Sequence, residues 1–218
     1  MSAEPDSPPN RLETVVALLI AVVTVIGALI AWRASVADDG AGDADFAGLR
    51  ASLNAEETRA LNAVDAYEHY GAYTDYWRYR ALGDELADAV VAAPAEAADA
   101  LDRQRAEAYD LADANQDLFP NRFLNRDGTY SVARETGEAW ADAAREQDLN
   151  PEPQYAEADK LRTKSNQLLG TITLLGLALV GYTLVETVEG RLKLLLAGGA
   201  TLVALVGVAL AVMLEVAR

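Results

Sequence analysis

The chain of 218 residues has no cysteine and only one histidine, His69. The absence of cysteine excludes disulfides and thiolate metal sites. The sequence also has no glycine-rich phosphate loop and no nucleophile motif, so acid–base and nucleophilic catalysis lack their usual residues. We therefore predict a protein that is not an enzyme and that has no catalytic residue, no cofactor and no metal.

Charged side chains are absent from three long apolar runs, residues 14–32, 168–184 and 194–214. Each run is close to the roughly 20 residues that cross a bilayer as a helix. Transport and proton relay usually need ionisable groups inside the membrane, so their absence argues against a secondary transporter. We predict three transmembrane helices, at residues 14–32, 166–187 and 191–214.

Basic residues are few between the first two runs. Residues 36–165 hold 28 Asp and Glu against 13 Lys and Arg, which accounts for −15 of the formal net charge of −16. Nucleic acid and anionic surfaces attract cationic proteins, so this acidity argues against a nucleic-acid partner. Cations or a basic protein are the partners that it favours.

Strand patterns are absent as well, and residues 54–165 have the pattern of helices. A capping-box pattern at Asn54 predicts that a helix begins there, with Gly83 as a candidate break. The preceding segment, residues 33–53, is rich in Asp, Gly and Ala and predicts a flexible acidic linker. Residues 1–13 form a predicted N-terminal tail.

Proline and serine mark the later helices. A second helix is predicted from Pro94 to residue 118, and a third from its cap Ser131 to residue 147, joined by an ordered turn. No helix breaker lies between Pro153 and Gly170, so the next helix is predicted to enter the membrane without interruption. The predicted fold is an all-α membrane protein with three transmembrane helices and a helical-bundle domain inserted between the first and the second.

Lysine and arginine near the span ends predict the orientation. Six lie on the side of the acidic domain and three on the other side, which predicts a cytoplasmic domain in a multi-pass protein of a prokaryotic inner membrane. The six are Arg33, Arg50, Lys160, Arg162, Lys164 and Arg218, and the three are Arg11, Arg191 and Lys193.

Two of the predicted spans carry small residues at alternating steps of three and four. In lipid, close approach of small residues is a main source of helix association, so these rows predict contacts with other helices. The alternative is that an Ala-rich chain forms such rows by chance. The first row is Ala17, Ala21, Thr24, Ala28 and Ala31, and the other is Ala197, Ala200, Ala204, Gly207 and Ala211.

Five tyrosines follow one another at intervals of three. Each such step turns by about 300° around a helix, so the row winds around it and must meet neighbours on several sides. The rings are predicted either to pack the core of the bundle, together with Trp140, or to form an interface with another subunit or partner. The row is Tyr67, Tyr70, Tyr73, Tyr76 and Tyr79, with Trp77 among them.

Two short patterns lack the residues of a metal site. His69 would share a helix face with Asp65, but the Glu that a diiron helix places three residues before its His is Ala66 here. The alternation of Asn125, Asp127 and Thr129 lacks the glycine position and the final Glu of a calcium loop. A bundle-edge histidine and an ordered turn are the predictions.

The layout and one short motif resemble a group of small bacterial membrane proteins of unknown function. These carry a Trp-x-Tyr-x-Gln-Ala-Lys-like motif, of which Trp77 and Tyr79 match in register. Arg80 and Ala81 match only if one residue is dropped, and Leu82 replaces the Lys. The resemblance implies the three-span layout and no activity or ligand.

These observations predict a non-enzymatic integral membrane protein whose partners are the lipid bilayer and further copies of itself. Its acidic domain would act as a scaffold or docking surface. The alternative is a pore-forming or ion-channel subunit, because small and hydroxyl residues can line a pore without charges.

Overall fold

The computed structural model describes residues 11–216, so most of the predicted tail and Arg218 lie outside the described residues. Its helices are α1 (Arg11–Ala92), α2 (Ala95–Gln116), the short 3₁₀ helix η1 (Asn121–Phe123), α3 (Val132–Glu146), α4 (Glu152–Thr187) and α5 (Arg191–Val216). Within this part of the chain the only strand-like feature is one isolated bridge between Leu124 and Tyr130. The all-α prediction is confirmed.

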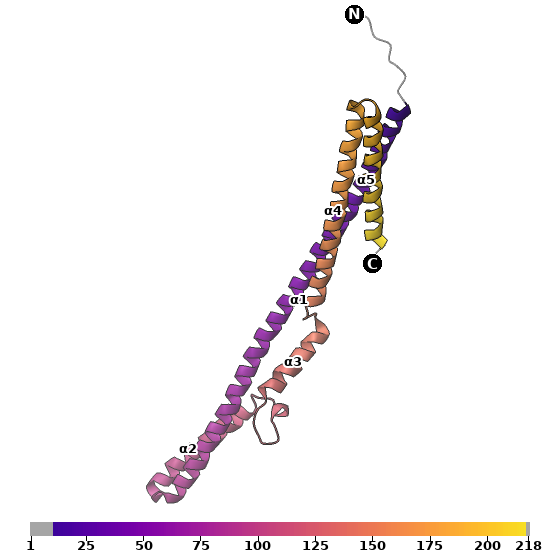
Figure 1. Ribbon diagram of the computed structural model, residues 1–218. Helices are drawn as coiled ribbons and strands as arrows, with labels where there is room; N and C mark the ends of the chain where they lie inside the picture. The colour runs from indigo at the N-terminus through magenta and orange to yellow at the C-terminus, as the bar shows by residue number, and fades with distance from the viewer. Residues whose placement is uncertain (1–10, 217–218) are drawn as a thin grey trace, which may run out of the picture. The chain divides into compact units, whose positions relative to one another are not determined.

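The chain forms two compact units. The membrane unit comprises residues 11–49 and 152–216 of the described chain, and the insert unit comprises residues 50–151. Three helices, α1, α4 and α5, are long and apolar enough to cross a membrane, which confirms the predicted number of candidate spans in the described residues. Figure 1 shows the start of α1 side by side with α4 and α5.

The predicted linker at residues 33–53 is wrong, because α1 is one helix of 82 residues that passes through it. Ala34, Ala37 and Ala41 are buried at steps of three and four. The start of α4 packs closely there, and the Ser165 hydroxyl donates a hydrogen bond to the Ala34 carbonyl (3.0 Å). The small side chains whose abundance suggested a flexible linker therefore form the contact surface of a closely packed helix pair.

Gly48 also allows α4 to pack closely against α1. A methyl group added there would lie 2.7 Å from the Tyr155 ring, closer than real carbon contacts allow. Arg162 of α4 also pairs with Asp45 of α1. The predicted uninterrupted course of α4 from its start into the apolar segment is confirmed.

Two further predictions about α1 are wrong. Asn54 lies inside the helix and caps nothing; its side-chain amide instead donates to the Asp148 carbonyl (3.3 Å). Gly83 does not break the helix. It makes room for Tyr109 of α2, whose ring carbon would lie 2.5 Å from an added methyl group and whose hydroxyl donates to Asp84 (2.8 Å).

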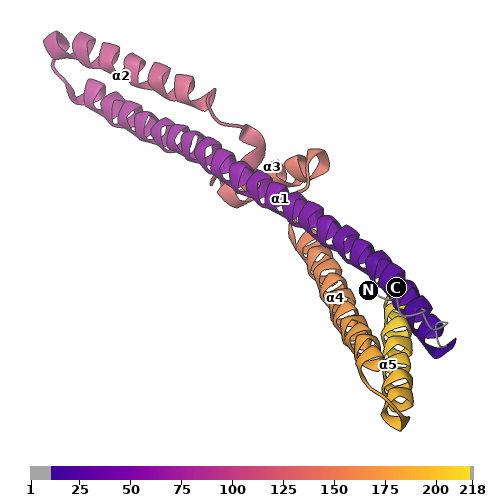
Figure 2. The same ribbon diagram turned by 90° about the horizontal axis from the view of Figure 1, so that it is seen from above.

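Within the insert unit the chain folds back along the part of α1 that belongs to this unit. Figure 2 shows α2 running alongside the last turns of α1. The predicted turn before α3 is confirmed, with Gly128 at φ 84° and the Thr129 backbone and hydroxyl donating to Asp127, which lowers the pKa of that carboxyl. Ser131 caps α3 as predicted, accepting from the Arg134 backbone N–H.

Candidate functional site

The row of small residues on α5 is used inside the chain. Ala200, Ala204, Gly207 and Ala211 are buried, and Ala197 is half-buried. α4 packs against them so closely that a methyl group on Gly207 would lie 3.0 Å from Leu175, and one on Gly181 would lie 2.9 Å from Ala200. This seam therefore joins α5 to α4 and leaves little surface for another chain.

The row of small residues on α1, which we call the α1 seam, has the opposite environment. All five of its residues, Ala17, Ala21, Thr24, Ala28 and Ala31, are exposed in the single chain. The face of α1 that packs on α4 and α5 is a different one, formed by Val16, Val23 and Ile30. A surface suited to close helix contact therefore has no partner within the described part of the chain.

Hydroxyl groups in the spans are satisfied locally. Thr24, Thr171, Thr173, Thr183 and Thr201 each donate to a carbonyl three or four residues earlier in the same helix. The fully buried Tyr182 of α4 donates to the Thr201 hydroxyl of α5 (3.0 Å), which adds a polar tie between the two helices. These groups stabilise helices in lipid, where an unpaired polar group is costly.

The tyrosine row winds around α1 as predicted. Tyr73 and Tyr76 pack with Phe119, Phe123 and Tyr130 in the aromatic core of the insert unit, and the Tyr73 ring meets Phe119 edge-on at 5.7 Å. On the other sides of the helix Tyr67 is 82% exposed, and Tyr70 and Trp77 are about half exposed. Tyr79 is half-buried beneath Arg78. Core packing therefore applies to Tyr73 and Tyr76, while the exposed rings stay available for the predicted interface.

Trp140 on α3 is half-buried instead of fully buried. The Arg59 guanidinium of α1 lies over its ring, 5.3 Å from the ring centre. The predicted core anchor is therefore an edge contact between α1 and α3, stabilised by a cation–π interaction.

Tyr67 belongs to a row of exposed apolar side chains on the insert-unit part of α1. Leu53, Leu61 and Val64 precede it and are each more than half exposed. The buried positions Ala51, Ala55, Thr58 and Ala66 lie on the other side of the helix, against the rest of the unit. α1 therefore presents an outward apolar row here as well, which we call the outer row: Leu53, Leu61, Val64 and Tyr67.

His69 shares a pocket wall with Asp65, and it has a partner on α3 that the sequence did not indicate. Its Nδ1 atom is hydrogen-bonded to Glu135 of α3, and the Tyr130 hydroxyl donates to the other Glu135 oxygen (3.0 Å). Burial of the Tyr130 phenol, and its hydrogen bond to this carboxylate, raise its pKa far above the ordinary value. Nothing in the local pattern at residue 135 distinguishes this buried carboxylate from a surface residue of a first helical turn.

The Glu135 cluster lies beside a pocket of about 200 Å³, whose polar lining includes Asp65, Arg122 and Glu138. Arg122 pairs with Glu138 at 2.9 Å. Over residues 11–216, no three His, Asp or Glu side chains come together as a metal-binding group. Glu135 holds the histidine ring in one orientation and thereby ties α1 to α3.

Sequence reasoning also missed a charged trio at one end of the spans. Arg33 of α1 donates two hydrogen bonds to Glu215 of α5, at 2.9 and 2.8 Å, and Lys164 of α4 donates a third at 3.0 Å. At the opposite end Lys193 pairs with Glu13 (3.1 Å). The lysines and arginines that served to predict the orientation therefore also connect the three helices.

Comparisons with protein-family models, with curated proteins and with solved structures found no match to this chain.

Proposed function

We propose that this protein is a non-enzymatic, homo-oligomeric membrane scaffold or docking protein. Its copies associate through the α1 seam, and the insert unit lies outside the membrane as an acidic helical docking domain. The observation that carries this proposal is the exposure of all five seam residues, while four of the five residues in the equivalent row on α5 are buried.

The outer row supports the same assembly independently. Leu53, Val64 and Tyr67 expose apolar side chains on an otherwise acidic helix, and tyrosine is a residue type that often dominates protein interfaces. In a scaffold, such side chains would be covered by another copy or by a basic partner. The acidity of residues 36–165 favours the basic partner at the remaining surface.

The mass of the particle in mild detergent tests the assembly. We expect a multiple of the chain mass for the wild type and a single copy for the Ala21→Leu/Ala28→Leu variant, because two leucines keep the helices apart. Val22→Phe is the matched control, since Val22 is exposed on α1 outside the seam. A monomeric wild type, or an oligomer that persists in the Ala21→Leu/Ala28→Leu variant, would contradict the proposal.

Ion flux separates the scaffold from the pore that the sequence left as its alternative. Purified protein reconstituted in liposomes is expected to give no flux above that of empty liposomes. Flux that disappears in the Ala21→Leu/Ala28→Leu variant would favour the pore. The Ala204 and Gly207 positions are unsuitable for this test, because both are buried inside the chain.

Labelling tests the orientation. Gly42 is exposed and the chain has no cysteine, so Gly42→Cys provides one reactive position. With the insert unit in the cytoplasm, a membrane-impermeant thiol reagent should label this variant only after the cells are opened. Efficient labelling of intact cells would place this segment outside.

A further inference from the structure

A local excess of positive charge marks one end of the spans. Arg33 and Lys164 share a single carboxylate, Glu215. One turn of α4 before Lys164 lies Lys160, whose only charged contact in the described chain is an exposed pair with Glu157 at 3.5 Å. Arg33, Lys164 and Glu215 therefore carry one net positive charge, and together with Lys160 they form a basic patch in a chain that is otherwise strongly acidic.

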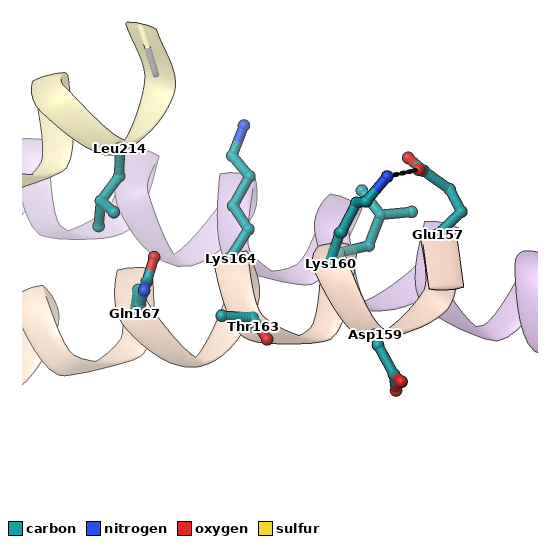
Figure 3. Close-up of a pocket in the computed structure, with 8 residues that line it drawn as sticks. Glu157, Asp159, Lys160, Thr163, Lys164, Gln167 and Leu214 are labelled. Carbon is teal, nitrogen blue, oxygen red and sulfur yellow. Dashed lines mark ion pairs between the residues drawn. The ribbon is translucent and has the colours of Figure 1, made fainter. Parts of the chain in front are cut away.

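A pocket of about 730 Å³ opens on this patch, and Lys160 and Lys164 form part of its wall. Figure 3 shows both lysines extending from the same side of α4, the side on which Leu214 of α5 lies. Two carboxylates also line the pocket. Glu157 pairs with Lys160, whereas the Asp159 side chain points to the other side of the helix and pairs with Arg162. Ammonium groups arranged this way are suited to bind a phosphate.

An apolar groove of about 210 Å³ lies next to Arg33 and Glu215, among the apolar residues of the spans. Arg33 and Glu215 form its polar end, and the rest of its lining is aliphatic. Lys164 joins the two cavities, because it lines the first and donates to Glu215 in the second. The aliphatic residues are Ile26, Leu29, Ile30, Leu168, Val208, Ala211, Val212 and Val216.

We propose that one anionic phospholipid binds here, with its phosphate on Lys160 and Lys164 and one acyl chain in the groove between α1 and α5. Two lysines in the wall of a pocket next to an aliphatic groove match the two parts of such a molecule. A free phosphate would leave the groove unfilled, and a zwitterionic lipid would not use the excess positive charge. The site lies within the membrane unit and does not depend on oligomer formation.

The test measures the thermal stability of the full-length protein, purified in mild detergent and freed of lipid. Phosphatidylglycerol is expected to raise the melting temperature of the wild type more than phosphatidylcholine does. Lys160→Gln should weaken this binding about fivefold and Lys160→Gln/Lys164→Gln about thirty-fold, given the contribution of each cation at a membrane surface. Lys160→Gln leaves the three Glu215 bonds intact, so its effect is separate from folding.

Two controls locate the site. Lys193→Gln removes a lysine at the other end of the spans and should keep the wild-type response to phosphatidylglycerol. Val212→Phe fills the groove and should weaken the response, whereas Val206→Phe, on the same helix but outside the groove, should not. Equal stabilisation by phosphatidylcholine or by inorganic phosphate, or an unchanged response in the double lysine variant, would overturn the proposal.

Discussion

The small-residue rows of α1 and α5 have the same spacing and opposite environments. The α5 row is buried against α4, and the α1 row is exposed. The two rows show that such a pattern specifies how closely a helix can be approached, but not which helix approaches it. The partner depends on how the chain connects the helices.

The connection explains the difference. α4 and α5 follow each other directly, with Gly190 at φ 75° in the short turn between them, so they pack as an antiparallel hairpin. This pairing occupies the α5 row. α1 joins the same hairpin through its Val16, Val23 and Ile30 face, and its row of small residues stays exposed.

The largest effect is expected inside the α5 row. Gly207→Leu forces a side chain against Leu175 in a packed interface, which should cost roughly 3 kcal/mol of folding free energy. Thermal unfolding followed by circular dichroism in detergent measures it. Gly199→Leu on the same helix has open space around its added carbon and should be close to neutral; equal losses in the two variants would refute the assigned packing.

A smaller loss is expected where α1 continues beyond its apolar segment. Gly48→Leu displaces the Tyr155 ring and should destabilise the membrane unit by about 2 kcal/mol, less than at Gly207 because this ring is partly exposed and can move. Gly42→Leu, six residues earlier, meets nothing and should be neutral or slightly stabilising. A flexible linker would show no difference between these variants.

Gly83→Ala should cost about 1 kcal/mol of folding free energy. The added methyl group displaces the Tyr109 ring, and this costs more free energy than the higher helix propensity of alanine contributes. Gly71→Ala, in the same helix and with nothing near the added methyl, should gain about that amount. In a Tyr109→Ala background Gly83→Ala should become stabilising as well. Failure of that sign change would mean that Tyr109 is not the obstacle.

The smallest effect on folding is expected in the α1 seam. Ala21→Leu and Ala28→Leu together should change the unfolding free energy of the single chain by less than about 0.5 kcal/mol, because both side chains are exposed. Hydrogen exchange of the α4–α5 hairpin, measured in the monomeric variant, should match that of the wild type. Faster exchange there would show that the seam also supports the fold.

Sequence predicted the features that depend on local pattern. The apolar runs, the Ser131 cap and the Gly128 turn follow from hydropathy and from backbone preferences, and all three are present. Residues 33–53 were misassigned because Ala, Gly and Asp are typical of linkers until a partner helix covers the small residues. The pairing of Glu135 with His69 and of Glu215 with Arg33 could not be predicted, because the partners are 66 and 182 positions apart.

The ion pairs at the two ends of the membrane unit have a consequence for the bilayer around it. Glu13 and Arg33 are 20 positions apart on α1, which is about 30 Å along a helix. Each takes part in a charged contact with another span, so neither end can slide into hydrocarbon without carrying its partners. The unit therefore matches a hydrocarbon thickness of about 30 Å, and a thicker or thinner membrane must deform around it or tilt it as one body.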